Sequence, residues 1–136
     1  MKRSNDLLVL LGRVALAALF VWSGAGKIPH FANIASSIAS KGLPLPQVLA
    51  AITVFVELGL GLAIIIGWRT RAAALLIALW LIPTTVLFHN FWAAPAAQAM
   101  MQQIQFMKNL SIFGGMLLLM ALGPGRMSVD GGRGRM

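Results

Sequence analysis

Four long apolar stretches divide this sequence, and they restrict its possible folds more than any other feature does. They cover residues 7–26, 47–66, 72–91 and 104–122. A helix needs about 20 apolar residues to cross the hydrocarbon core of a bilayer, and each stretch is close to that length. With 59% hydrophobic and 10% charged residues, the chain is too apolar for an ordinary soluble domain. We therefore predict an all-α integral membrane protein, an antiparallel bundle of four transmembrane helices.

The distribution of basic residues predicts the orientation of the bundle. Most Lys and Arg residues outside the apolar stretches fall on the side of the N-terminus, whereas the connections on the other side carry Lys27 and Lys41. Cytoplasmic segments are enriched in Lys and Arg, so we expect both termini in the cytoplasm. The residues on the N-terminal side are Lys2, Arg3, Arg69, Arg71, Arg126, Arg133 and Arg135.

The domain organisation follows from the same pattern. Residues 1–125 form one transmembrane domain, and the glycine- and arginine-rich residues 126–136 are predicted to be a flexible basic cytoplasmic tail. An alternative treats the first stretch as a cleaved signal peptide, because Lys2 and Arg3 precede it. That stretch is longer than a usual signal-peptide core and contains Arg13, which favours a span.

Charge and cysteine content exclude several classes of function. The net charge is +8, but the basic residues are scattered at the ends of apolar stretches and form no stripe with interleaved aromatics, so we exclude nucleic acid as a partner. The absence of cysteine removes dithiol relays, thiolate metal sites and iron–sulfur clusters from this chain. His30 and His89 are the two histidines, and haem ligation would require the loop residue His30 to reach the bundle, so we disfavour haem and predict no metal site.

Glu57 is the most informative polar residue, because it is the only acidic residue between Asp6 and Asp130 and lies near the middle of the second stretch. An ionisable side chain at the centre of a membrane helix costs roughly 2.5 to 3.5 kcal/mol, so it usually faces the bundle and has a partner. We expect that partner to be Arg13, which shares a face of the first span with Lys27. The pair is either structural or handles a proton or a ligand; in a third reading Arg13 extends to the headgroups and Glu57 is protonated.

A second polar group is expected where the third span ends and the fourth begins. His89 and Trp92 lie at the first of these ends, and Lys108 and Asn109 lie at the second. They would line a water-accessible mouth that anchors the head of a quinone-like or other amphiphilic ligand, unless His89 is merely a hydrogen-bonded interfacial residue. The candidate ligand-binding or proton-handling residues are thus Arg13, Glu57, His89, Lys108 and Asn109, with Lys27 and Trp92 as secondary candidates and no catalytic residue assigned.

The chain resembles the bacterial inner-membrane branch of the DoxX family over nearly its whole length. The order and spacing of many short pieces carry the resemblance, not any one of them. The pieces are Gly12-Arg13, Ser23-Gly24, Lys27, Gly42-Leu43-Pro44, Glu57, Gly67-Trp68-Arg69-Thr70-Arg71, His89-Asn90-Phe91-Trp92, Lys108-Asn109-Leu110-Ser111, Gly114-Gly115, Gly123-Pro124-Gly125 and Ser128-Val129-Asp130.

The resemblance implies a multi-pass four-helix bundle in the bacterial cytoplasmic membrane. The family takes its name from a subunit associated with quinone-linked oxidation of sulfur compounds, whereas distant animal relatives act as receptor chaperones, so the fold does not fix the activity. Three functions follow. The first is an accessory subunit of a membrane oxidoreductase linked to a quinone or a sulfur compound, not catalytic alone. The others are a non-catalytic scaffold or assembly factor and a small transporter. Expected partners are the lipid bilayer, other oxidoreductase subunits and further copies of the chain.

Overall fold

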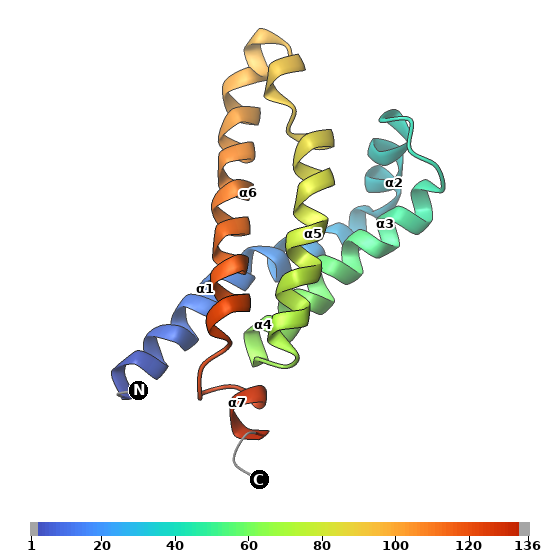
Figure 1. Cartoon of the computed structure of the whole chain (residues 1–136). Coiled ribbons are helices and arrows are strands. Elements are labelled where there is room, and N and C mark those ends of the chain that lie inside the picture. Colours follow the sequence, from blue (N-terminus) through green and yellow to red (C-terminus); the bar gives the residue numbers. More distant parts are fainter. Residues whose placement is uncertain (1–2, 134–136) are drawn as a thin grey trace.

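Every element of the computed structural model is helical across residues 3–133, the part of the chain that it describes (Figure 1). Four helical stretches in this part are long and apolar enough to cross a membrane, with mean hydropathies of 1.4 to 2.5. Both termini lie at the same end of the bundle (Figure 1). The predicted all-α membrane protein with four spans is confirmed. The four stretches are Asn5–Ser40, Pro46–Ile66, Thr70–Ala93 and Ala96–Leu122.

The first stretch is longer than the sequence pattern indicates. Helix α1 (Arg3–Lys27) is followed by a short 3₁₀ turn, η1 (Ile28–His30), and then by α2 (Phe31–Ser40). The sequence analysis expected a connection directly after the first span. Helix α2 forms because its apolar residues recur at helical spacing, and Ala35 and Ile38 are buried against the following helix.

The second stretch returns antiparallel to α1 and is not a uniform α-helix. It consists of α3 (Pro46–Val54), a π-helical segment η2 (Phe55–Leu60) and α4 (Gly61–Ile66). Pro46 suits the first turn of a helix because the missing N–H has no intrahelical acceptor there. Gly67 ends α4 with φ +74°, the left-handed conformation in which glycine is favoured.

The third and fourth stretches form a helical hairpin. Helix α5 (Thr70–Phe88) is connected through the 3₁₀ turn η3 (Phe91–Ala93) to α6 (Ala96–Leu122), and the two stand side by side in Figure 1. The fourth span, α6, begins at Ala96, well before the apolar stretch that starts at residue 104. The uncharged segment 92–103 connects the third and fourth apolar stretches of the sequence. In the structure it supplies most of η3 and the first two turns of α6.

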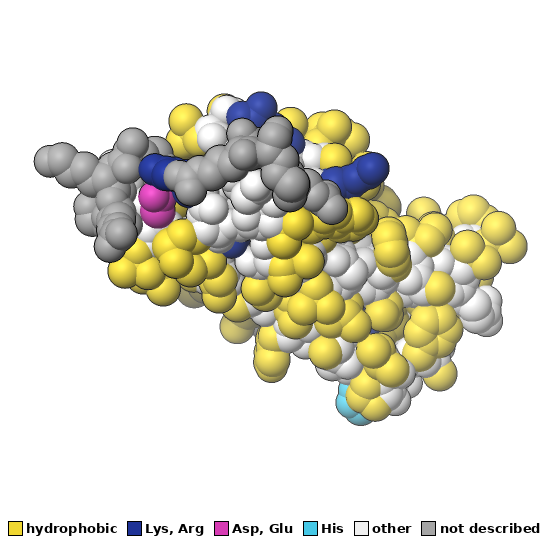
Figure 2. Space-filling view, turned by 90° about the horizontal axis from the view of Figure 1, so that it is seen from below, with side chains coloured by type: hydrophobic (Ala, Val, Ile, Leu, Met, Phe, Trp, Pro, Cys, Tyr) yellow, Lys and Arg dark blue, Asp and Glu magenta, His cyan; other side chains and the backbone are white. Residues whose placement is uncertain are grey.

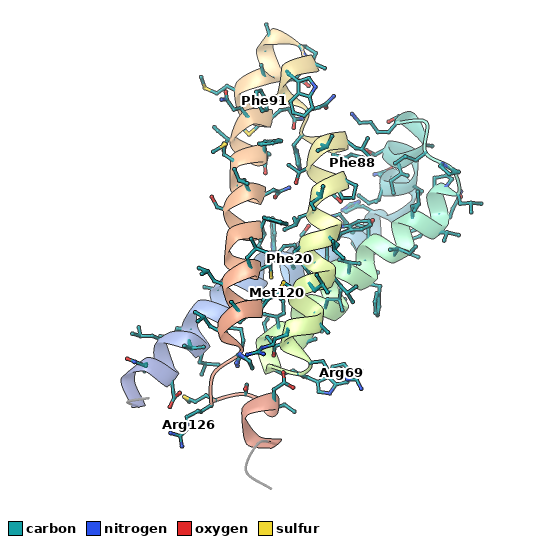
Figure 3. The ribbon with its side chains drawn as sticks, viewed as in Figure 1. Phe20, Arg69, Phe88, Phe91, Met120 and Arg126 are labelled. Carbon is teal, nitrogen blue, oxygen red and sulfur yellow. The ribbon has the colours of Figure 1, made fainter. Side chains whose placement is uncertain are left out.

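Two apolar clusters hold these elements together. The larger one joins α1, α4, α5 and α6, and its fully buried members include Ala17, Ile64, Ile77 and Met116; Phe20 points into it from α1 (Figure 3). The smaller one joins α2 to α3 through Ala35, Ile38 and Ala50, and Phe88 of α5 packs against it. The α2–α3 pair is therefore attached to the hairpin through a separate and smaller set of contacts than the main core.

Helix α7 (Val129–Arg133) closes the end of the bundle that carries the termini. The Asp130 carboxylate accepts hydrogen bonds from the backbone N–H groups of Arg69 and Thr70, at 2.9 and 2.8 Å, and from the Thr70 hydroxyl at 2.8 Å. It thus caps the N-terminus of α5, where a negative charge is favourable. Part of the predicted flexible tail is therefore helical and bonded to the bundle, while residues 134–136 lie outside the described part.

The same end of the molecule carries a group of basic side chains. Seen from that end, several Lys and Arg side chains gather on one part of the surface, while hydrophobic side chains cover much of the rest (Figure 2). Arg69 and Arg126 both point away from the helices into the surroundings (Figure 3). This arrangement suits a protein whose sides face lipid and whose basic end faces headgroups and water.

Candidate functional site

Glu57 lies within the π-helical segment η2 and faces α1. A π-helical turn widens the helix by one residue per turn and is uncommon, and such turns are found most often at functional sites. The Glu57 side chain is 13% exposed, so it is largely enclosed by protein. The lone acidic residue of the second span therefore occupies an irregular turn of the helix and not a regular one.

Lys27 is the partner of Glu57. Its Nζ atom lies 2.7 Å from Glu57 Oε2 and also donates a hydrogen bond of 2.6 Å to Ser23 Oγ, one turn earlier on α1. Two of the three Lys27 N–H groups are therefore used, which leaves one for another acceptor. An ammonium and a carboxylate in direct contact at this depth reduce the cost of placing either charge near lipid.

Arg13 does not contact Glu57, which corrects the pairing expected from the sequence. Its guanidinium donates hydrogen bonds to three backbone carbonyls: Pro124, Met127 at 2.9 Å, and Ile65 at 3.2 Å. Ile65 lies in the last turn of α4, about 12 Å along the helix from Glu57, beyond the reach of an Arg side chain. The carbonyls at a helix end lack intrahelical partners, so they attract a buried guanidinium. Arg13 is 3% exposed and holds the C-terminal segment against the bundle.

A cavity of about 520 Å³ lies between α1, α2, α3, α5 and α6, next to the Lys27–Glu57 pair. Its walls are mostly apolar, with polar groups at a few places, as in small-molecule sites. Lys27, Glu57, His89, Lys108 and Asn109 all line it, whereas Arg13 and Trp92 do not. The structure thus brings five of the seven candidate residues to one space. The apolar lining residues include Phe20, Leu49, Trp80, Leu87, Phe88 and Ile112.

The polar residues of α5 and α6 at this cavity each have a neutral partner. His89 Nδ1 lies 2.9 Å from Gln102 Oε1, and Lys108 Nζ donates to Gln105 Oε1. Asn109 donates from Nδ2 to Thr85 Oγ1 at 3.0 Å, a buried hydrogen bond that ties α6 to α5. These bonds leave His89 Nε2, two Lys108 N–H groups and the Asn109 side-chain carbonyl free of the partners named here.

Trp92 has a structural environment and not a ligand-binding one. It is 59% exposed, and its ring packs edge-on against Phe91 and Phe106, with centroids 5.3 and 6.0 Å apart. Figure 3 shows Phe91 at the tip of the α5–α6 hairpin. An exposed indole beside other aromatic rings is typical of a membrane–water interface.

Ser23 and Trp80 are among the cavity residues that sequence reasoning did not select. Ser23 accepts a hydrogen bond from Lys27 and lines the cavity, and Trp80 lines it from α5. Trp80 could have been selected from the sequence, because it lies near the middle of a predicted span. The other three tryptophans lie near predicted span ends. A tryptophan at such depth is away from the interface where its ring is usually found. Ser23 carries no such signal.

This fold and cavity define a small multi-pass helical membrane protein with a polar pair facing a mostly apolar cavity. A sequence profile of the DoxX family matches residues 8–90. The chain therefore belongs to the DoxX family, as the sequence analysis predicted.

Two bacterial relatives match over almost their whole length. Inner membrane protein YqjF of Escherichia coli strain K12 is 37% identical over 130 residues, which cover 96% of this chain and 95% of that protein. Inner membrane protein YphA of the same organism is 34% identical over 127 residues, 93% of this chain and 91% of that protein. The protein is accordingly an integral inner-membrane protein.

Eukaryotic relatives match over a shorter region. The Surfeit locus protein 4 homolog of Drosophila melanogaster is 31% identical over 70 residues, which cover 49% of this chain and 26% of that protein. No solved structure matches this chain.

Proposed function

We propose that this protein binds a small amphiphile in the cavity beside Lys27 and Glu57 and serves as an accessory subunit of a membrane oxidoreductase linked to a quinone or a sulfur compound. The observation that carries the proposal is the cavity itself, lined by candidate residues from all four helical stretches. A cavity of this size falls within the range of small-molecule sites, about 300 to 1,000 Å³.

The energetics of the bundle support a binding role for this space. Unfilled volume in a protein interior costs stability because the lining atoms lose contacts, so a bundle that served packing alone would be expected to fill it. Charged groups inside a membrane are also costly and usually mark functional sites. Here both costs occur at the same place, beside the π-helical turn that carries Glu57.

The lining suits a quinone or a similar ligand. A quinone head has carbonyl acceptors, and Lys27, His89 and Lys108 bring N–H groups to the cavity wall. The aromatic and aliphatic side chains between them would contact the ring and part of an isoprenoid chain. These residues would hold and orient the group, and the quinone itself would supply the electron chemistry.

An accessory role fits the residues of the chain. The sequence has no cysteine, so it cannot hold an iron–sulfur cluster or run a dithiol relay by itself. Electrons would have to enter and leave through a bound cofactor and a partner subunit. The exposed lipid-facing surfaces of the four spans leave room for such a partner or for further copies of the chain.

A scaffold or assembly factor is the second candidate, and one observation favours it. Arg13 and Asp130 tie the C-terminal segment to α4 and α5 through hydrogen bonds that have no connection with the cavity. A protein whose main task is to present a fixed surface would need such ties. Under this alternative the cavity would bind no small molecule.

Thermal unfolding of the purified protein distinguishes these two functions. Protein in mild detergent would be heated with and without a short-chain ubiquinone. We expect the quinone to raise the melting temperature of the wild type and to lose this effect in Glu57→Gln and His89→Ala. His30→Ala is the matched control, because His30 is exposed and does not line the cavity. Absence of any shift in the wild type would favour the scaffold, and so would shifts of equal size in all four proteins.

A further inference from the structure

The end of the bundle opposite the termini, called here the distal end, carries an excess of positive charge. It includes the connections at 41–45 and 89–95, and the cavity lies next to it. Lys27 ends α1, Lys41 directly follows α2, and Lys108 lies near the middle of α6. Glu57 is the one carboxylate available to them, because Asp130 caps α5 at the terminal end and Asp6 lies near the start of α1. Three lysines therefore share one acidic residue.

The contacts show which of these lysines lack a counter-charge. Lys27 is neutralised by Glu57 at 2.7 Å. Lys108 meets the neutral amide of Gln105, and the Lys41 ammonium lies 5.7 Å from the ring centroid of Phe88. Neither Lys41 nor Lys108 has a carboxylate within ion-pair distance among residues 3–133.

Both unpaired lysines are positioned at the cavity. Lys108 lines it directly, and Phe88, which lies under Lys41, is another lining residue. Phe88 projects from α5 toward the α2–α3 pair (Figure 3), so the Lys41 ammonium lies close to the cavity wall. Apart from the Lys27–Glu57 pair and a few other polar groups, the rest of the cavity wall is apolar, with Leu49, Trp80 and Ile112 among its residues.

The positive charges of Lys41 and Lys108 beside an apolar cavity would select ligands by the charge of their head groups. Two cations without counter-ions attract an anion more strongly beside a low-dielectric cavity than they would in water. The apolar walls then favour a hydrocarbon chain. A neutral head would gain hydrogen bonds there but no ionic attraction.

From this arrangement we infer that the cavity takes an amphiphile with an anionic oxygen head, a carboxylate or a phosphate, held by Lys41 and Lys108 above a single apolar chain. The inference rests on the proposed ligand site, and it differs from the proposal of a quinone in giving the head of the ligand a negative charge. It places Lys41, which the candidate residues did not include, among the residues that determine specificity.

Tryptophan fluorescence tests the inference, because Trp80 lines the cavity while Trp22, Trp68 and Trp92 are exposed. With these three changed to Phe, Trp80 reports on the cavity alone. The variant would be placed in phosphatidylcholine nanodiscs and titrated with 12-bromododecanoate or 12-bromododecan-1-ol, whose bromine quenches tryptophan on contact. The two probes share a chain and differ in the head.

We expect saturable quenching by the carboxylate at concentrations at least tenfold lower than by the alcohol. Lys108→Gln should lower the affinity for the carboxylate probe at least tenfold, and Lys41→Gln should also lower it. Arg126→Gln is the control, since Arg126 is exposed at the terminal end. Competition with unlabelled dodecanoate and dodecyl phosphate identifies the preferred anionic head, and either result supports the inference.

Other outcomes would overturn it. Equal, non-saturating quenching by the two probes would mean that the probes only partition into the lipid. Lys41 and Lys108 would then interact with lipid headgroups and not with a ligand in the cavity. Saturable binding that is tighter for the alcohol, together with a quinone-induced melting shift, would leave the proposed function standing and refute the anionic head. Neither quenching nor a melting shift would refute both.

Discussion

Gly24 of α1 lies directly against the backbone of Leu58 in the π-helical turn. A methyl group at Gly24 would fall 2.7 Å from the Leu58 amide nitrogen and 3.0 Å from Glu57 Cβ. The absence of a side chain at this position therefore allows the two helices to approach closely. Lys27 follows one turn later on α1, so this approach also sets the separation at which its ammonium meets the Glu57 carboxylate.

The first prediction concerns this contact. Gly24→Ala should force α1 and η2 apart and lower the free energy of unfolding by about 1 to 3 kcal/mol, as overpacking does. Gly26→Ala is the control, since no atom lies within 4 Å of a methyl group placed there. It should leave stability unchanged or raise it by up to about 1 kcal/mol, because alanine favours helix over glycine. Denaturant titration followed by circular dichroism measures both, and equal effects would contradict the close packing.

The second prediction concerns the charge pair. Glu57→Gln leaves the Lys27 ammonium without its counter-ion and should destabilise the protein by about 1.5 to 3 kcal/mol. Lys27→Met should do the same to the carboxylate. The double variant Lys27→Met with Glu57→Gln should be more stable than the sum of the single effects predicts, because neither charge is left alone. Strict additivity of the two single changes would show that the pair is not coupled.

The third prediction concerns the carboxylate cap of α5. Asp130→Ala removes three hydrogen bonds at the start of that helix and should cost about 0.5 to 2 kcal/mol. It should also make the backbone after Arg126 more accessible to trypsin. Val129→Ala is the control, because Val129 is 40% exposed and its side chain has no part in the cap. Timed digestion that cuts both variants at the wild-type rate would argue against the docked segment.

The fourth prediction concerns Arg13. Arg13→Lys keeps the charge but loses the planar guanidinium that reaches three separate carbonyls. We expect a loss of roughly 1 to 3 kcal/mol in unfolding free energy, since buried carbonyls are left unpaired. Leu11→Ala changes a lipid-exposed neighbour and should have a small effect. In a thermal unfolding experiment, Arg13→Lys should have a lower melting temperature than Leu11→Ala.

The fifth prediction concerns orientation in the membrane, for which both termini are proposed to be cytoplasmic. The chain has no cysteine, so single cysteines can be introduced without background labelling. In intact spheroplasts, a membrane-impermeant maleimide should label Ser40→Cys, at the exposed end of α2, and should not reach Met127→Cys until the membrane is permeabilised. The reverse pattern would invert the topology.

Sequence alone was sufficient for the number of spans and for the buried faces. Hydropathy over about 20 residues responds to the thickness of the bilayer, which is the same for every protein. The face of α1 that carries both Arg13 and Lys27 was also predicted, because helical periodicity fixes which side chains point the same way.

Depth within the bundle could not be predicted in this way. Arg13 and Lys27 lie on the same face of α1, about 21 Å apart along the axis, and periodicity does not say which of them is level with Glu57. That depends on how α1 and η2 are offset along their axes, and hydropathy carries no information on this offset. The π-helical turn and helix α2 were missed for a related reason, since each depends on packing between distant segments.

Because Asp130 caps α5, the start of that helix can be completed only after the C-terminal segment has been synthesised. The turn at Gly67, Arg69 and Thr70 emerges from the ribosome long before the residue that satisfies its N–H groups, because the whole α5–α6 hairpin is made in between. Until then the backbone N–H groups of Arg69 and Thr70 and the Thr70 hydroxyl lack the acceptor that Asp130 provides. A polypeptide that stops short of Asp130 would insert all four spans and still leave this turn unfinished, so the closing hydrogen bonds distinguish a full-length product from a truncated one.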